Sequence, residues 1–343
     1  MKSIVKKLLY VLLTLFLILI ISNISLISYG VSQAKGQFSI LWNVKTIEET
    51  IQDPAFPDSL KSNLKLVTEI KQYAIDSLGL KPTKNYTTVF DQKGKDVLWV
   101  VSACEPFAFE PRMWKFPIIG SFTYKGFFDK TKAREFVEEL KQEGLDLHVR
   151  PVSGWSTLGW FKDPILSNML SGSVGELANT IIHELTHGTI FVPDSMTFNE
   201  NLATFIGDKG AEKFLAYKYG DDSDEFINYS NRKQDSKKFT KYVVSAANNL
   251  DSLYNKISEF SDSVKLSKKT ASIDSIIENL DTVQFVSNNR YNEMYLNYRP
   301  NNAYFISFLN YRERQDELEA MLYTDMDSSL LNFIGYWKAN YLN

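Results

Sequence analysis

Residues 174–187 of this 343-residue chain read VGELANTIIHELTH, and this stretch decides how the chain around it folds. Its apolar side chains recur at steps of three and four residues, which is the spacing of one face of an α-helix. The stripe consists of Val174, Leu177, Ala178, Ile181, Ile182 and Leu185. The spacing predicts an amphipathic helix on which His183 and His187 border the core.

The end of this helix carries the pattern H-E-x-x-H at 183–187. Residues four apart lie about one turn along the same face, so His183 and His187 would aim both imidazoles at one point beside Glu184. A hydrolytic zinc site uses this arrangement, with the histidines as ligands and the glutamate as general base. Chance spacing on an ordinary helix is the alternative. It is weakened because the chain has only 3 His, and the third, His148, lies in a strand-like segment.

The third zinc ligand is expected to be a carboxylate. A hydrolytic zinc keeps three protein ligands and leaves its fourth position to water, and no histidine follows His187. Residues 198–205, FNENLATF, begin a second predicted helix after a turn. Glu200 in this segment is the predicted ligand, with Asp194 and Asp208 as the alternatives.

Glu200 also has a purely structural interpretation. Thr197 precedes it by three residues, which is the spacing of a capping box at the start of a helix. In that interpretation the Glu200 carboxylate bonds only the backbone. The sequence around Glu200 fits both roles, and the zinc site still requires a third ligand.

The chain resembles a bacterial family that carries the name "putative aminopeptidase", of the gluzincin type. In that family H-E-x-x-H is followed on the next helix by N-E-x-x-A-T, which carries the glutamate ligand. Here the second motif is NENLAT at 199–204. The likeness extends to Gly36-Gln37, to STLGWFKDP at 156–164, and to NNA at 301–303 followed by Tyr311. It covers the chain after residue 30.

The resemblance implies an α+β fold with a gluzincin or thermolysin-like core, in which a small mixed or antiparallel sheet packs on a mainly helical, zinc-bearing half. It implies a single metallopeptidase domain over 31–343, with the sheet in 31–173 and the zinc site in 174–343. An edge strand of such a sheet can bind an extended peptide through main-chain hydrogen bonds. The segments 118–128 and 145–152 are the candidate edge strands.

Local patterns predict the remaining elements of the first half. Helices are expected near 45–53, 57–78 and 129–143, and strands near 118–128 and 145–152. A hairpin is expected from strands 86–91 and 96–103, which flank the turn-like residues 92–95. After residue 174 the chain is expected to be almost entirely helical.

The N-terminal 30 residues read as a signal peptide or a membrane anchor. Lys2, Lys6 and Lys7 precede an apolar run from Leu8 to Ile21. The lysines would hold the N-terminus in the cytoplasm, so either interpretation exports the body of the protein. The predicted location is therefore extracytoplasmic, in the bacterial envelope, with the protein anchored to the membrane or secreted.

Composition excludes two classes of protein. With 44% hydrophobic and 23% charged residues and a net charge of −3, the chain resembles neither a disordered protein nor a nucleic-acid binder. Its one cysteine, Cys104, permits no internal disulfide and ends an apolar strand, so it is expected to be buried.

These observations predict an exported zinc aminopeptidase that acts on peptide substrates, with Glu184 as the catalytic base. The competing predictions are an endopeptidase that processes envelope proteins, and a non-catalytic binding module that retains the zinc fold. Glu105 and Glu110 are candidates for holding a substrate ammonium group, or are solvated loop charges. The aromatic loop 154–161 is either a pocket wall or local packing, and Tyr304 and Tyr311 have no assigned role.

Overall fold

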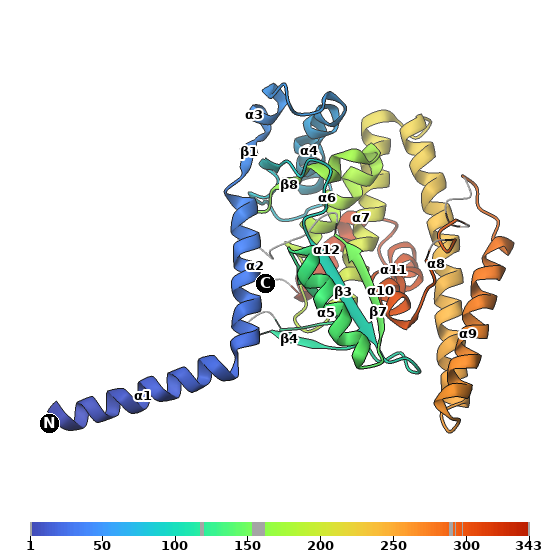
Figure 1. Ribbon diagram of the computed structural model, residues 1–343. Coiled ribbons are helices and arrows are strands. Elements are labelled where there is room, and N and C mark those ends of the chain that lie inside the picture. The colour runs from blue at the N-terminus through green and yellow to red at the C-terminus, as the bar shows by residue number, and fades with distance from the viewer. Residues whose placement is uncertain are drawn as a thin grey trace.

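The computed structural model describes residues 2–116, 120–152, 162–287, 291, 293–296 and 298–341. Three small sheets lie against a mainly helical second half, which confirms the predicted α+β class (Figure 1). The first half contributes α3 (Ile47–Gln52), α4 (Asp58–Asp76) and α5 (Lys130–Gln142). The second half contributes α6 (Val174–His187), α7 (Met196–Tyr219), α8 (Asp224–Lys256), α9 (Asp262–Asn279), α10 (Asn302–Arg312), α11 (Gln315–Thr324) and α12 (Leu330–Tyr341). Short 3₁₀ helices occur at Ser167–Ser171 and Leu280–Thr282.

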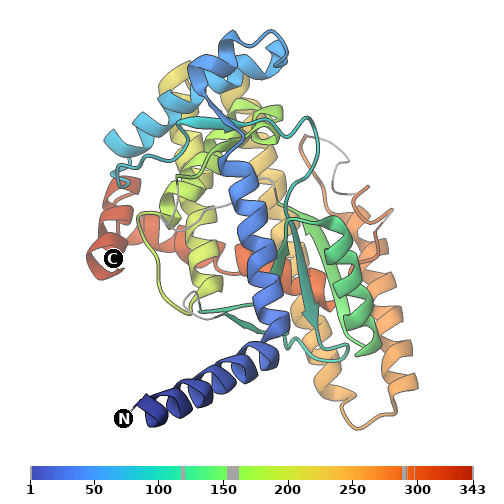
Figure 2. The same ribbon diagram turned by 60° about the vertical axis from the view of Figure 1, so that its left-hand side comes forward.

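Two helices precede the body of the molecule. The first, α1 (Lys2–Ser22), points away from the body, whereas α2 (Ile24–Leu41) lies along its side (Figures 1 and 2). Helix α2 runs across residue 30, where the leader was predicted to end. Within the described part of the chain, no helix has both the length and the apolar character needed to cross a membrane.

A close approach at one glycine holds α2 against the body. The Tyr29 hydroxyl and the Gln33 side chain both donate to the Gly126 carbonyl oxygen, at 2.8 and 2.9 Å. A Cβ atom at Gly36 would lie 2.2 Å from the Phe128 ring, so no larger residue fits there without movement. These contacts make α2 part of the folded body rather than a free extension.

The strands form three separate sheets. The first sheet is mixed and has the order β1 (Val44–Thr46), β2 (Thr88–Phe90), β8 (Ile165–Leu166). The second is antiparallel, with β3 (Trp99–Cys104) between β6 (Tyr124–Phe127) and β7 (Asp146–Pro151). The third pairs β4 (Trp114–Phe116) with β5 (Gly120–Phe122). Both candidate edge segments thus lie at edges: 145–152 forms β7, and 118–128 contains β5 and β6.

The predicted hairpin over 86–103 is wrong. The turn at 92–95 is present, since Lys93 and Gly94 adopt positive φ and the Lys95 amide donates to the Gln92 carbonyl oxygen. However, β2 pairs with β1 and β8, and β3 pairs with β6 and β7. The Gln92 amide donates to the Ser167 hydroxyl at 2.8 Å and the Gln92 side chain accepts from the Asn168 amide. These long-range bonds hold β2 beside β8, so a local turn signal did not determine the pairing.

Three hydrophobic clusters divide the molecule. The largest surrounds α6 and includes α4 and α7, the second lies among α8, α9 and α10, and the third lies between the β3 sheet and α5. Cys104 is buried as predicted, and burial raises the pKa of its thiol to about 12. Helix α10 contacts both α7 and the β3 sheet, so it joins the helical half to the sheet.

Candidate metal centre

Helix α6 is fixed in place by an N-terminal cap and by its buried apolar face. It begins with a capping box, in which the Ser173 hydroxyl accepts from the Glu176 amide and the Glu176 carboxylate accepts from the Ser173 amide. Leu177, Ile181 and Ile182 are fully buried, as the predicted stripe requires. The helix is thereby anchored through its apolar face, and its final turn carries both histidines at the rim of the core.

The residues on either side of Glu200 orient it. The Asn199 side chain accepts from the Val192 amide and donates to the Val192 carbonyl oxygen, at 2.9 and 2.7 Å, which closes the turn after α6. The Asn201 side chain donates to the Asn310 carbonyl oxygen at 2.8 Å and so joins α7 to α10. With both neighbours occupied elsewhere, Glu200 is left on the side of α7 that faces α6.

The structure brings His183, His187 and Glu200 together, as the sequence predicted, and their ligand atoms lie within 4.8 Å of one another. The two Nε2 atoms are 3.1 Å apart. Glu200 Oε2 lies 3.3 Å from His183 Nε2 and 3.5 Å from His187 Nε2. The three side chains are 15%, 9% and 12% exposed, so the group is largely enclosed but reachable.

This triangle fits a zinc ion. Zinc binds histidine and carboxylate ligands at about 2.0–2.1 Å in tetrahedral geometry, which separates the ligand atoms by roughly 3.3 Å. The three observed separations, 3.1, 3.3 and 3.5 Å, bracket that value. Two imidazoles and one carboxylate that leave a fourth position open are the donor set of a hydrolytic zinc site.

The two alternative ligands lie elsewhere. Asp208 is held by Lys233 and by Arg312, the latter at 2.8 Å, and it also accepts from the Asn179 amide. Burial opposes its ionisation, but the two cations outweigh it and hold the pKa of Asp208 well below its usual range. Asp194 is exposed in the turn between α6 and α7. Neither belongs to the described metal-binding group.

The capping interpretation of Glu200 does not hold. Helix α7 begins after Ser195, and Thr197 lies inside the helix, where its hydroxyl donates to the Asn310 side chain at 3.0 Å. Thr197 is therefore not the residue that caps this helix. The Glu200 carboxylate points to the two histidines instead.

Electrostatics distinguish the two glutamates. Burial raises the pKa of Glu200, but the charges and hydrogen bonds of His187 and His183 outweigh it, so the pKa is lowered and the carboxylate stays ionised. For Glu184 burial dominates over the attraction of the same histidines, and its pKa is raised. An ionised Glu200 suits a ligand, whereas a raised pKa at Glu184 suits a group that exchanges protons.

Two further residues reach this site from the sheet and α10. The Tyr311 ring lies 6.3 Å from the His183 ring and nearly parallel to it, with 21° between the planes. The Arg150 guanidinium on β7 donates to the Tyr311 hydroxyl at 3.0 Å. Burial, and next the charge of Glu200, raise the pKa of Tyr311 to about 12, so its hydroxyl keeps its proton. The sequence offered no local signal that would place Arg150 beside this group, because Tyr311 lies 161 residues further along the chain.

Other candidate residues lie away from the metal group. Glu105 is beside the start of α10, where its carbonyl oxygen accepts from the Asn302 side chain. Tyr311 is nine residues further along that helix, about 14 Å at 1.5 Å per residue. Tyr304 packs on His148. The aromatic loop 154–161 lies outside the described residues.

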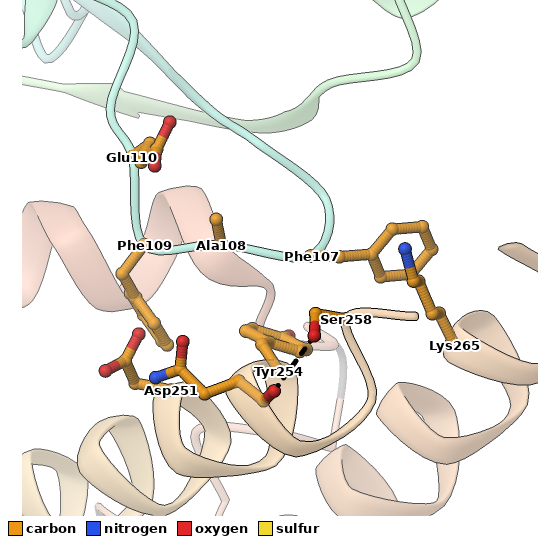
Figure 3. A pocket seen from close by; sticks show the side chains of 9 residues that line it. Phe107, Ala108, Phe109, Glu110, Asp251, Tyr254, Ser258 and Lys265 are labelled. Atoms are coloured by element: carbon orange, nitrogen blue, oxygen red, sulfur yellow. Dashed lines mark hydrogen bonds between the residues drawn. The ribbon is translucent and has the colours of Figure 1, made fainter. Parts of the chain in front are cut away.

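Glu110 lines a separate cavity of about 340 Å³ between the 105–110 loop and helices α8 and α9. Figure 3 shows Phe107 and Lys265 at one end of this cavity and Phe109 at the other. None of the three metal-group residues lines it. The structure therefore does not bring Glu105 and Glu110, the candidates for binding a substrate ammonium group, to the metal group.

Comparison with known proteins gives one match. A family model described as "Putative aminopeptidase" matches residues 28–339. Neither a curated protein nor a solved structure matches the chain. Because the matched segment includes α6, α7, β7 and α10, it covers every residue that the structure brings to the metal group, and the chain belongs to the family described as "Putative aminopeptidase".

Proposed function

We propose that the protein is a zinc-dependent aminopeptidase in which His183, His187 and Glu200 hold the metal. The observation that carries the proposal is the triangle of ligand atoms, whose three separations match those around a tetrahedral zinc ion. A family named for aminopeptidase activity supports the reaction class. Zinc bound here would supply a water of lowered pKa, about 7, and would polarise the carbonyl of the scissile bond.

Glu184 is the proposed general base and acid. It lies on α6 between the two histidines, and the charges of His183, His187 and Glu200 all act on its carboxylate, which supports a position beside the metal group. Its raised pKa lets it take a proton from water and later donate that proton to the leaving amine. Glu200 remains ionised and serves as a ligand only.

The decisive experiment compares Glu184→Gln with the unchanged protein. The variant should retain one zinc per chain and lose peptide hydrolysis by a factor of about 100 to 10,000, the usual contribution of a general base. Glu212→Gln is the matched control, because Glu212 lies on α7, is only partly buried, and forms an ion pair with Lys209 instead of joining the metal group. Full activity in Glu184→Gln would assign the base elsewhere.

Aminopeptidase action is tested with paired peptides that differ only at the N-terminus. Peptides with a free amino group should be hydrolysed and their N-acetylated counterparts should not. Equal cleavage of both would make the protein an endopeptidase. No zinc and no cleavage of either peptide would favour a binding module.

We also propose that the body of the protein is exported. The N-terminal lysines followed by the apolar run of α1 support this, since lysines hold that end in the cytoplasm. Fractionation of cells that express the full chain should place the protein outside the cytoplasm. Sequencing of its N-terminus would show whether the leader is removed. Recovery of the protein in the cytoplasm would contradict export.

A further inference from the structure

Strand β7 carries a guanidinium that has no carboxylate of the described residues within ion-pair distance, and Glu200 acts on it only as a charge at longer range. The described hydrogen bond of Arg150 goes to the Tyr311 hydroxyl. All Asp and Glu side chains of the chain lie within the described residues, and none of them forms an ion pair with Arg150. The neighbouring arginine differs, because Arg312 pairs with Asp208 at 2.8 Å. On α10, Tyr311 therefore binds an arginine that lacks a carboxylate partner, whereas the adjacent Arg312 has one.

A partly buried guanidinium without an ion-pair partner is unfavourable unless a ligand supplies the counter-charge and the missing hydrogen-bond acceptors. Arginine has five N–H donors in a planar fork that matches the two oxygens of a carboxylate, and Tyr311 accepts from one of them. The charge is felt nearby: burial, and next the charge of Arg150, lower the pKa of His148 to about 4. Arg150 thus acts as a positive charge on its surroundings, and the donors that Tyr311 does not use remain for an anionic ligand.

The position of this charge relative to the metal group suits a short peptide. Tyr311 contacts both sides, since its hydroxyl bonds Arg150 and its ring lies over His183. In a dipeptide or tripeptide the C-terminal carboxylate lies one or two residues beyond the scissile bond, about 4–8 Å away. A bond held at the metal group therefore brings such a carboxylate towards β7.

We propose that Arg150, together with the Tyr311 hydroxyl, binds a carboxylate of the substrate, and that the preferred substrates are short peptides with a free C-terminus. This inference rests on the proposed function, because it places the scissile bond at the metal group. An acidic side chain next to the scissile bond offers the same carboxylate chemistry, so the test separates the two sources.

Binding is measured first, in the Glu184→Gln background, by calorimetry with Ala-Leu and with Ala-Leu amide. The free acid should bind on the order of 10- to 100-fold more tightly, the usual value of a hydrogen bond to a charged group. Adding Arg150→Gln should abolish the difference, and Arg150→Lys should restore part of it. Arg112→Gln is the matched control, since Arg112 is exposed and pairs with Glu143.

Kinetics on the active protein then identify the source of the carboxylate. A preference for Ala-Leu over its amide that disappears in Arg150→Gln assigns the C-terminal carboxylate. A preference for Ala-Glu amide over Ala-Gln amide that disappears in the same variant assigns an acidic side chain. Circular dichroism of both Arg150 variants checks their folding, and Arg150→Lys serves if Arg150→Gln does not fold.

Two results would overturn the inference. Equal binding of acid and amide by the protein with Arg150 intact would show that no carboxylate is recognised. An equal loss of kcat/KM for acid and amide in Arg150→Gln would make Arg150 a positioning residue for Tyr311. Failure of the proposed function is distinguishable, because absence of zinc or of hydrolysis leaves the binding difference measurable.

Discussion

The two sides of the site, here called its walls, differ in whether their buried charged side chains have partners of opposite charge. In the helical wall, formed by α6 and α7, the charged side chains have charged partners: Glu200 faces His183 and His187, and Asp208 pairs with Lys233 of α8 and Arg312 of α10. In the sheet wall, formed by β7 and Tyr311 of α10, Arg150 donates to the Tyr311 hydroxyl and has no carboxylate within ion-pair distance among the described residues. The comparison shows two uses of buried charge. Charged side chains that already have partners can hold a cofactor in place, whereas a charged side chain without an ion-pair partner is suited to binding a charged substrate.

The largest expected effect falls on the helical wall. Glu200→Ala should lower zinc affinity by more than about 100-fold. Removing a residue that only hydrogen-bonds to a metal ligand already lowers metal affinity by about 10- to 100-fold, and Glu200 is proposed to be a ligand itself. Glu212→Ala, on the same helix, should leave zinc content unchanged. Metal analysis after dialysis provides the measurement. Stoichiometric zinc in Glu200→Ala would move the third ligand elsewhere.

Asp208→Asn should destabilise the fold without removing zinc. It leaves Lys233 and Arg312 as two buried cations without a counter-charge, and breaking such a group costs about 3–5 kcal/mol of unfolding free energy. Asp194→Asn is the control, since Asp194 is exposed and asparagine tolerates its positive φ. Denaturant unfolding and zinc analysis are compared for both variants. Loss of zinc from folded Asp208→Asn would make Asp208 a ligand after all.

The sheet wall should lose stability in mild acid through His148. Its pKa is lowered to about 4 in the folded state and is about 6.5 when unfolded, so the unfolded chain binds the proton first. Neutral His148 therefore contributes fully to the free energy of unfolding above pH 6.5. About 3 kcal/mol of that free energy is lost as the pH falls towards 4.

His148→Gln should remove this part of the pH dependence, measured as the difference in unfolding free energy between the two proteins from pH 4 to 7. Subtraction cancels the pH dependence that both proteins share. Parallel curves would show that His148 titrates equally in the folded and unfolded states.

The smallest expected effect on stability concerns the packing of α2 against the half of the molecule that contains the sheets. Gly36→Ala forces a Cβ into the Phe128 ring and should cost about 1–3 kcal/mol, as overpacking usually does. Gly30→Ala is matched, because nothing lies within 4 Å of its Cβ and alanine favours a helix. Thermal unfolding of the two variants should therefore shift in opposite directions. Equal shifts would mean that α2 does not dock as described.

The difference between the walls also explains what could be predicted. His183 and His187 lie one turn apart on one helix, so their convergence follows from helical geometry alone. Glu200 lies at the start of the next helix, and the need for a third ligand favoured it over Asp194 and Asp208, but only the structure excluded its capping role. Arg150 and Tyr311 are 161 residues apart, and no local pattern links a strand residue to a helix that distant.

The sequence by itself determined the amphipathic helix α6 and the two histidines with Glu184 on it, and it favoured Glu200 as the third ligand. These depend on spacing within one element or between consecutive ones, whereas the α+β class was implied by the family resemblance. Only the tertiary structure decided that β2 pairs with β8 rather than β3, that Asp208 faces cations, and that Arg150 reaches Tyr311. Those contacts depend on which buried polar groups find partners across the whole fold, and that is decided by packing rather than by periodicity.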